Sequence, residues 1–287
     1  MFDSIRCYVN SSRCDIFNNF ILIAAGLVIT IYALVANIVA SVGIWRLYRR
    51  HMKRTPKLLL SLFATNLLTA SAVASLYLYH FIEEFLQSWF FSVHLSIIAF
   101  SISWSSTIVL MVTLDRFLLV VRGNCYLYWK KNFCILTIVS GLVDASWSMY
   151  FYFGLKYLGC VTNLINLAVF GAILLINLIL SLFTNIAMMR YVRKNVSLIG
   201  STRVNMRNEV ANTVFAMTMS STCCQIVLIS LLVVFVSSFA IEMAVAKYGG
   251  ILIVLFIIFV LFNCGTIPLT YIVGNSRMLN TLRCENA

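Results

Sequence analysis

Hydrophobic residues fall into seven long runs that short polar connections separate. The runs lie at 19–45, 58–82, 91–114, 133–155, 164–189, 210–241 and 248–273. Each run is long enough to cross a bilayer as a helix that rises about 1.5 Å per residue. The runs do not alternate in polarity, as the strands of a membrane β-barrel do. The pattern therefore predicts an all-α bundle of seven transmembrane helices that forms one domain over residues 1–287.

The composition supports a membrane protein. Hydrophobic residues make up 62% of the chain and charged residues 10%, whereas soluble proteins average about 45–50% and about 25%. A net charge of +12 would suit nucleic acid on a soluble domain, but here the basic residues punctuate apolar runs. We therefore expect the bilayer, and no nucleic acid, as a partner. The nine cysteines are scattered without metal-ligand spacing, so we expect no metal and no cofactor.

The basic residues also predict an orientation. Of 21 Lys and Arg residues, 17 lie at or after the ends of the first, third and fifth runs or in the tail. Positive residues favour the cytoplasmic side, which places residues 1–18 outside the cell and the tail 274–287 inside, in the plasma membrane. Asn10 begins a glycosylation sequon on the outer segment, and Asn195 begins another on the inner side, where no glycosylation occurs.

The third run ends in the charged pair Asp115 and Arg116, followed by Phe117. A carboxylate beside a guanidinium at the membrane boundary can form a partly desolvated pair that holds only while its neighbours stay in place. Such a pair would act as a switch. The alternative is that Arg116 simply anchors the inner end of the helix.

The sequence Asp115-Arg116-Phe117 at the inner end of the third run, together with seven spans and an outer amino terminus, resembles the pattern of the rhodopsin-like class of G-protein-coupled receptors. Helix one has Ala36-Asn37 where the family usually has Gly-Asn, and Pro56 falls in the turn into helix two. The stretch from Asn263 through Pro268 to Tyr271 is similar to the family's Asn-Pro-x-x-Tyr region. The resemblance covers nearly the whole chain, and Pro56 and Pro268, its only prolines, both fall on family positions.

The resemblance implies a heterotrimeric G protein as partner, contacted through a switch formed by Asp115, Arg116, Phe117, Pro268 and Tyr271. Pro268 lacks an amide hydrogen, so we expect a kink and a free carbonyl that water or a neighbouring side chain satisfies. Tyr271 would swing between partners, or would serve only as an interfacial anchor. Four buried polar residues in separate helices are expected to form an inner polar cluster: Asn37, Asn66, Ser105 and Asn263.

The chain also departs from the family pattern. Asn66 stands where the family typically has an aspartate, so we expect weak or absent sodium binding. Residues 221–226 lack the Cys-Trp-x-Pro sequence of helix six. Phe91 takes the place of the usual cysteine, which leaves open whether a disulfide joins Cys7, Cys14 or Cys160 in the outer segments.

The family's ligand pocket lies among helices three, five, six and seven near the outer face. Ile98 stands where amine receptors carry an aspartate, so a cationic amine would lack its counter-ion. The expected lining is mostly apolar and suits a small neutral or lipophilic ligand. It comprises Tyr77, His94, Ile98, Ile102, Asp144, Gln225, Ile257 and Leu261. Asp144 would be a functional group within the membrane, a protonated acid, or a residue that reaches the headgroups.

Residues 275–284 predict a short C-terminal amphipathic helix, with Cys284 as a palmitoylation site. No HExxH, GxSxG or paired aspartates occur, so we expect no enzyme. The sequence thus predicts a receptor that passes an extracellular signal to a G protein. The alternatives are a ligand-independent or decoy receptor of the same fold and, behind it, a small-solute transporter.

Overall fold

A computed structural model describes residues 20–48, 54–80, 89–121, 123–157, 160–195, 201–240 and 245–275. All of the secondary structure in this part of the chain is α-helical. The helices are α2 (Phe20–Tyr48), α3 (Arg54–His80), α4 (Trp89–Val121), α5 (Gly123–Tyr157), α6 (Cys160–Asn195), α7 (Ser201–Ala240) and α8 (Val245–Gly274). They correspond in number and order to the seven predicted runs.

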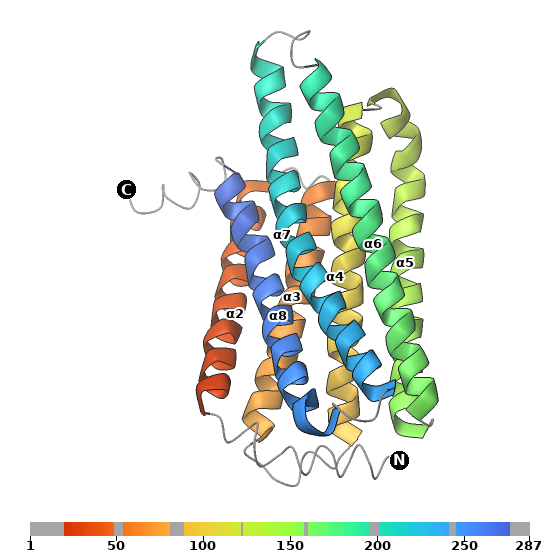
Figure 1. The fold of residues 1–287 in the computed structure, drawn as a ribbon. Coiled ribbons are helices and arrows are strands. Elements are labelled where there is room, and N and C mark those ends of the chain that lie inside the picture. The colour runs from red at the N-terminus through yellow and green to blue at the C-terminus, as the bar shows by residue number, and fades with distance from the viewer. Residues whose placement is uncertain are drawn as a thin grey trace.

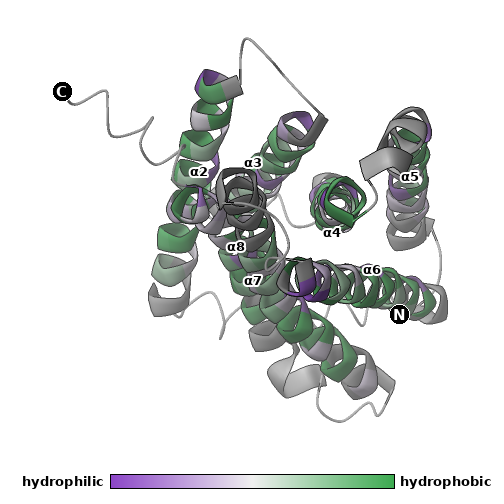
Figure 2. Cartoon of the chain, turned by 90° about the horizontal axis from the view of Figure 1, so that it is seen from above, coloured by the Kyte–Doolittle hydropathy of each residue, from purple (hydrophilic) through white to green (hydrophobic). Residues whose placement is uncertain are grey.

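The seven helices run alternately up and down in one bundle (Figure 1). Because their number is odd, α2 begins at one end of the bundle and α8 finishes at the other. The end at which α4 finishes, the upper one in Figure 1, is called here the Arg116 end. Seen along the bundle, α4 lies among α3, α5, α6 and α7 (Figure 2), and it packs against all four.

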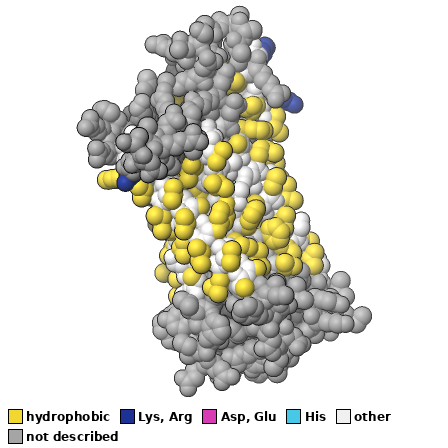
Figure 3. Space-filling view, turned by 90° about the vertical axis from the view of Figure 1, so that its left-hand side faces the viewer, with side chains coloured by type: hydrophobic (Ala, Val, Ile, Leu, Met, Phe, Trp, Pro, Cys, Tyr) yellow, Lys and Arg dark blue, Asp and Glu magenta, His cyan; other side chains and the backbone are white. Residues whose placement is uncertain are grey.

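Burial confirms that α4 is the central helix. In its apolar stretch 72% of the residues are buried, against 28% in that of α6. Hydrophobic side chains of α2, α5 and α6 instead face outward over much of their length. On the face shown in Figure 3, which is the left-hand side of Figure 1, hydrophobic side chains form a broad apolar band, with cationic side chains toward one end of the described surface. An apolar exterior of this extent is what a bilayer covers.

Six of the described helices are long and apolar enough to cross a membrane. In α5 the apolar stretch is shorter, Ile135–Tyr150, and it includes polar residues such as Ser140 and Asp144. The helix itself nevertheless has 35 residues and runs beside α4 along the bundle. The chain is therefore a multi-pass membrane protein with six or seven spans.

Several helices extend beyond the predicted apolar runs. The run predicted to begin at 133 belongs to a helix that begins at Gly123, and the run predicted from 210 belongs to one that begins at Ser201. Hydropathy marks the part of a helix inside the bilayer, whereas the backbone hydrogen bonds continue past it. Pro56 lies in the first turn of α3, where a missing amide hydrogen costs little. The expected tail helix at 275–284 lies, but for Asn275, outside the described residues.

The interior holds two main apolar clusters with polar residues between them. The Tyr271 cluster lies toward the Arg116 end and contains Phe63, Met217 and Tyr271 among others. The Leu261 cluster contains Ala33, Ile98 and Leu261. A third, smaller cluster joins α5 to α6 through stacked rings of Trp147 and Phe170, whose centroids are 5.1 Å apart.

α2 packs closely against α8 at Gly265. A Cβ atom at this position would lie 2.3 Å from Cε1 of Tyr32, well inside van der Waals contact. Glycine is disfavoured by about 1 kcal/mol in a helix interior, so the close packing of the two helices explains its presence. This contact sets α2 directly beside the segment of α8 that precedes Pro268.

Candidate functional site

The site is built around one backbone oxygen of α8. Pro268 lies inside this helix and has no amide hydrogen, so it cannot donate to the carbonyl four residues earlier, that of Cys264. Two side chains from other helices take up that oxygen. Asn37 Nδ2 on α2 donates to Cys264 O at 2.9 Å, and Asn66 Nδ2 on α3 donates to it at 3.5 Å. The Cys264 carbonyl thus links three helices.

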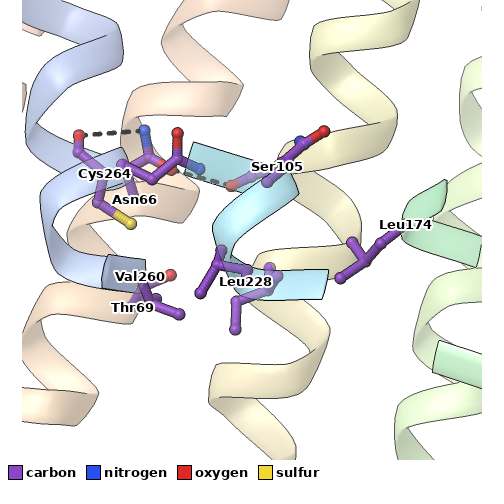
Figure 4. Close-up of a pocket in the computed structure, with 10 residues that line it drawn as sticks. Asn66, Thr69, Ser105, Leu174, Leu228, Val260 and Cys264 are labelled. Atoms are coloured by element: carbon purple, nitrogen blue, oxygen red, sulfur yellow. Dashed lines mark hydrogen bonds between the residues drawn. The ribbon is translucent and has the colours of Figure 1, made fainter. Parts of the chain in front are cut away.

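Asn66 extends the same network to α4. Ser105 Oγ donates to Asn66 Oδ1 at 2.9 Å, as Figure 4 shows. Asn37, Asn66 and Ser105 are all buried, where polar groups need partners inside the protein. Three of the four residues expected in the inner polar cluster are therefore joined, directly or through Cys264 O. The fourth, Asn263, lies beside them, and its buried Oδ1 has no hydrogen-bond partner in the described structure.

A cavity adjoins this network on the side of the Leu261 cluster. It is about 10 Å³ in volume, which is about the space that one water molecule needs. Its lining residues come from α3, α4, α6, α7 and α8 (Figure 4). They are Asn66, Thr69, Ile102, Ser105, Leu174, Gln225, Leu228, Val260, Asn263 and Cys264. The cavity is too small for an organic ligand.

The apolar residues expected in a ligand pocket do come together. Ile98 and Leu261 are members of the Leu261 cluster, and Ile102 and Ile257 pack against it. In the described part of the chain they form a packed interior beside the small cavity. His94 is buried on α4, and the side chain of Tyr77 lies outside the described residues.

Gln225, which was expected to line a ligand pocket, forms a hydrogen bond with α4. Its Nε2 donates to Ser106 Oγ at 3.3 Å. The bond joins α7 to the central helix at the residue that directly follows Ser105. Ser106 was not among the residues predicted from the sequence, because α4 carries several hydroxyl residues between 101 and 107 and the sequence does not show which of them face α7.

Asp144 lies apart from the Leu261 cluster. Ser103 Oγ donates to its Oδ1 at 2.5 Å, and Thr107 Oγ1 donates to its Oδ2 at 3.0 Å. Asn177 Nδ2 on α6 in turn donates to Thr107 Oγ1 at 3.3 Å. With 4% of its surface exposed, Asp144 does not reach the headgroups. These four residues, named here the Asp144 cluster, tie α5 and α6 to α4.

Sequence reasoning missed the hydroxyls that hold Asp144. Ser103 and Thr107 are four residues apart and share one face of α4. This spacing is the available signal, since a lone carboxylate within a membrane helix needs hydrogen-bond donors on a facing helix. Spacing alone does not say which helix of the bundle that face meets.

The expected switch residues gather at the Arg116 end. Asp115 is fully buried, while Arg116 and Phe117 are partly buried. The Nε atom of Arg116 is buried without a hydrogen-bond partner. Tyr271 packs edge-on against Phe63 with ring centroids 6.1 Å apart, and Asn275 Nδ2 donates to its hydroxyl at 3.3 Å.

Two further contacts hold α7 near the Arg116 end. The hydroxyl oxygens of Thr113 on α4 and Thr218 on α7 are 3.4 Å apart. Thr213 Oγ1 on α7 donates to Gly274 O at the end of α8 over 2.5 Å. Together with Gln225, these hydroxyls fix α7 to α4 and α8 through neutral hydrogen bonds.

The remaining predicted sites lie outside the described part of the chain. These are the glycosylation site at Asn10, the outer cysteines Cys7 and Cys14, and the palmitoylation site at Cys284. Cys160 begins α6, and its side chain is likewise outside the described residues. The disulfide, the glycan and the lipid anchor stay predictions.

The fold and the polar network are the basis for assigning a function, because sequence comparison adds nothing to them. No protein-family model matches the chain, and no curated protein matches it.

Proposed function

We propose that the chain is a rhodopsin-like G-protein-coupled receptor that passes an extracellular signal to a heterotrimeric G protein. The observation that carries this proposal is the carbonyl freed by Pro268 on the last helix, which binds amides from the first two helices. In the same bundle an Asp-Arg pair lies in the last two turns of the central helix, five residues before its end at Val121. A transporter or a channel would need broken helices or a polar pore instead.

Signal transfer would proceed by movement of α7. Neutral hydrogen bonds hold this helix to α4 and α8 through Thr213, Thr218 and Gln225. Each such bond contributes about 0.5–1.5 kcal/mol net. A ligand that prefers the form in which these bonds are broken therefore needs a difference of only a few kcal/mol to shift the equilibrium. Release of α7 would open the bundle beside Arg116 for the G protein.

The signal itself would be a small neutral or lipophilic molecule. The Leu261 cluster supplies apolar walls, with Ile98 where a counter-ion for an amine would stand. Such a ligand would separate packed side chains, because the cavity beside this cluster has room for only about one water molecule. The receptor would lie in the plasma membrane with its amino terminus outside.

Signalling of three variants in transfected cells tests the proposal. Thr213→Val keeps the side-chain shape but removes the donor to Gly274 O, so we expect basal G-protein activation to rise several-fold. Arg116→Ala should abolish that activation, alone and combined with Thr213→Val. Lys57→Ala is the matched control, since Lys57 is an exposed basic residue at the same end of the bundle, and it should change nothing.

Equal surface expression of all variants is required for the comparison. Retained signalling in Arg116→Ala would contradict the assigned role of Arg116. Absence of signalling from both the wild type and Thr213→Val would favour the decoy receptor. Two departures from the family pattern support this second candidate. Residues 221–226 lack the Cys-Trp-x-Pro sequence, and Ile267 stands where the family has an asparagine or aspartate before the proline.

A further inference from the structure

A groove on the outside of the bundle combines apolar walls with a cation. It measures about 210 Å³, lies between α6 and α7, and is lined by Ile186, Met189, Arg190 and Phe215. Ile186 and Arg190 are exposed and stand one turn apart on α6, and exposed Lys194 follows one turn later. One helix face therefore changes from apolar to cationic along the groove.

The position of the groove matches the edge of the bilayer. The apolar stretch of α6 runs over Ile165–Val192, so Arg190 stands near its end. At this end α6 and α7 extend past the ends of α2 and α8 (Figure 1). The acyl-chain region would thus adjoin Ile186 and Met189, while Arg190 and Lys194 reach the depth of the headgroups.

We propose that this groove binds an anionic phospholipid of the cytoplasmic leaflet. The lipid phosphate pairs with Arg190 and Lys194, and one acyl chain lies along Ile186, Met189 and Phe215. The assignment to the cytoplasmic leaflet rests on the orientation included in the proposed function. Binding of the lipid does not depend on signalling.

The chemistry favours an anionic lipid over other occupants. A guanidinium offers a planar set of donors that fits phosphate oxygens, and an adjacent ammonium adds charge. Anionic lipids are concentrated in the cytoplasmic leaflet, and each basic residue near that surface strengthens their binding. A zwitterionic lipid gains less from these two cations, and a soluble protein segment does not reach apolar walls that face the bilayer.

Competition between two lipids tests the site on the full chain. Native mass spectrometry of the protein from micelles with equal amounts of phosphatidylserine and phosphatidylcholine gives the ratio of the two bound lipids. We expect a preference for phosphatidylserine in the wild type and a decrease of about five-fold in Arg190→Gln, the factor that one basic residue contributes at such a surface. Lys57→Gln is the matched control and should keep the wild-type ratio, because Lys57 is on α3, which packs against α2, α4 and α8.

A second variant distinguishes the contribution of the apolar walls from that of the two cations. Met189→Trp fills the apolar part and should lower the binding of both lipids while keeping their ratio. If Lys57→Gln and Arg190→Gln lowered the preference for phosphatidylserine equally, the proposal would be overturned. The preference would then come from the overall positive charge of the surface. Displacement of phosphatidylserine by inorganic phosphate, with no effect of Met189→Trp, would show a phosphate site in place of a lipid site. A failure of the receptor assay leaves all of these readouts unchanged.

Discussion

The Cys264 carbonyl shows how a single residue type can organise contacts between helices. Counting back four positions from Pro268 identifies the freed oxygen from the sequence alone. Its partners are not readable in that way, because they depend on how α2 and α3 are rotated in the packed bundle. Asn37 and Asn66 were predicted as buried polar residues, but their shared acceptor is visible only in the structure.

A double-mutant cycle tests whether Pro268 and Asn37 act on the same oxygen. Asn37→Ala removes the donor at 2.9 Å from Cys264 O and should lower the free energy of unfolding by about 1–3 kcal/mol. In a Pro268→Ala background the restored amide of residue 268 donates to that oxygen, so the same substitution should cost less. We expect a coupling free energy of about 1 kcal/mol, measured by denaturant unfolding in detergent.

Thr30→Ala provides the control for this cycle. Thr30 is also buried on α2, but its hydroxyl donates to Gly26 O within the same helix. Its effect should therefore add to that of Pro268→Ala. Additivity of Asn37→Ala with Pro268→Ala would contradict the shared-oxygen interpretation.

For whole elements, hydropathy predicted the number and order of the helices well and their ends poorly. Seven runs correspond to seven described helices, yet α5 begins ten residues before its run and α7 nine before. These polar extensions lie beyond the apolar segment, where hydropathy carries no signal for a helix. The partners of Asp144 were missed for a related reason, since the register of α5 against α4 is set by tertiary packing.

The Asp144 cluster is expected to fix α5 to the bundle. Asp144→Leu leaves Ser103 and Thr107 without their acceptor and should lower the stability by about 1–2 kcal/mol. Asp144→Asn keeps one acceptor oxygen and should fall between this variant and the wild type. Thermal unfolding in detergent measures both effects. None of the four residues of the Asp144 cluster lines the described cavity, so the cavity should be unaffected.

Ser140→Ala is the matched control on the same helix. The Ser140 hydroxyl donates to Leu136 O of its own helix and lies at the exposed side, so its loss should change the melting temperature little. If Ser140→Ala lowered the melting temperature as much as Asp144→Leu, the loss of any polar side chain on α5 would have this effect. Unchanged stability in Asp144→Leu would show that apolar contacts such as Trp147 with Phe170 hold α5 by themselves.

At the scale of the whole molecule, the described residues form a bundle of seven helices with an apolar exterior. Because the number is odd, the start of α2 and the end of α8 lie at opposite ends of the bundle. Composition was sufficient to predict this class of protein. The ligand pocket was harder to predict from the sequence. Hydropathy places apolar residues in the interior, but it does not show whether space is left between their side chains. In the described part they pack closely and leave a cavity the size of one water molecule.

Glycosylation tests the predicted orientation of the whole chain. With the amino terminus outside, Asn10 should carry a glycan and Asn195 should not, although both begin a sequon. Treatment with a glycosidase should therefore reduce the apparent mass of the wild type and of Asn195→Gln. It should leave Asn10→Gln unchanged. A glycan that is lost in Asn195→Gln would reverse the assigned sides.

The single oxygen of Cys264 also bears on how freely the last helix can shift. It accepts hydrogen bonds from two amides of neighbouring helices, one at 2.9 Å and the other at 3.5 Å. A small slide of α8 toward Asn66 lengthens the first bond while it shortens the second, so the loss and the gain offset each other. The helix stays tethered through a range of positions of similar energy, and a weak external push is enough to choose among them.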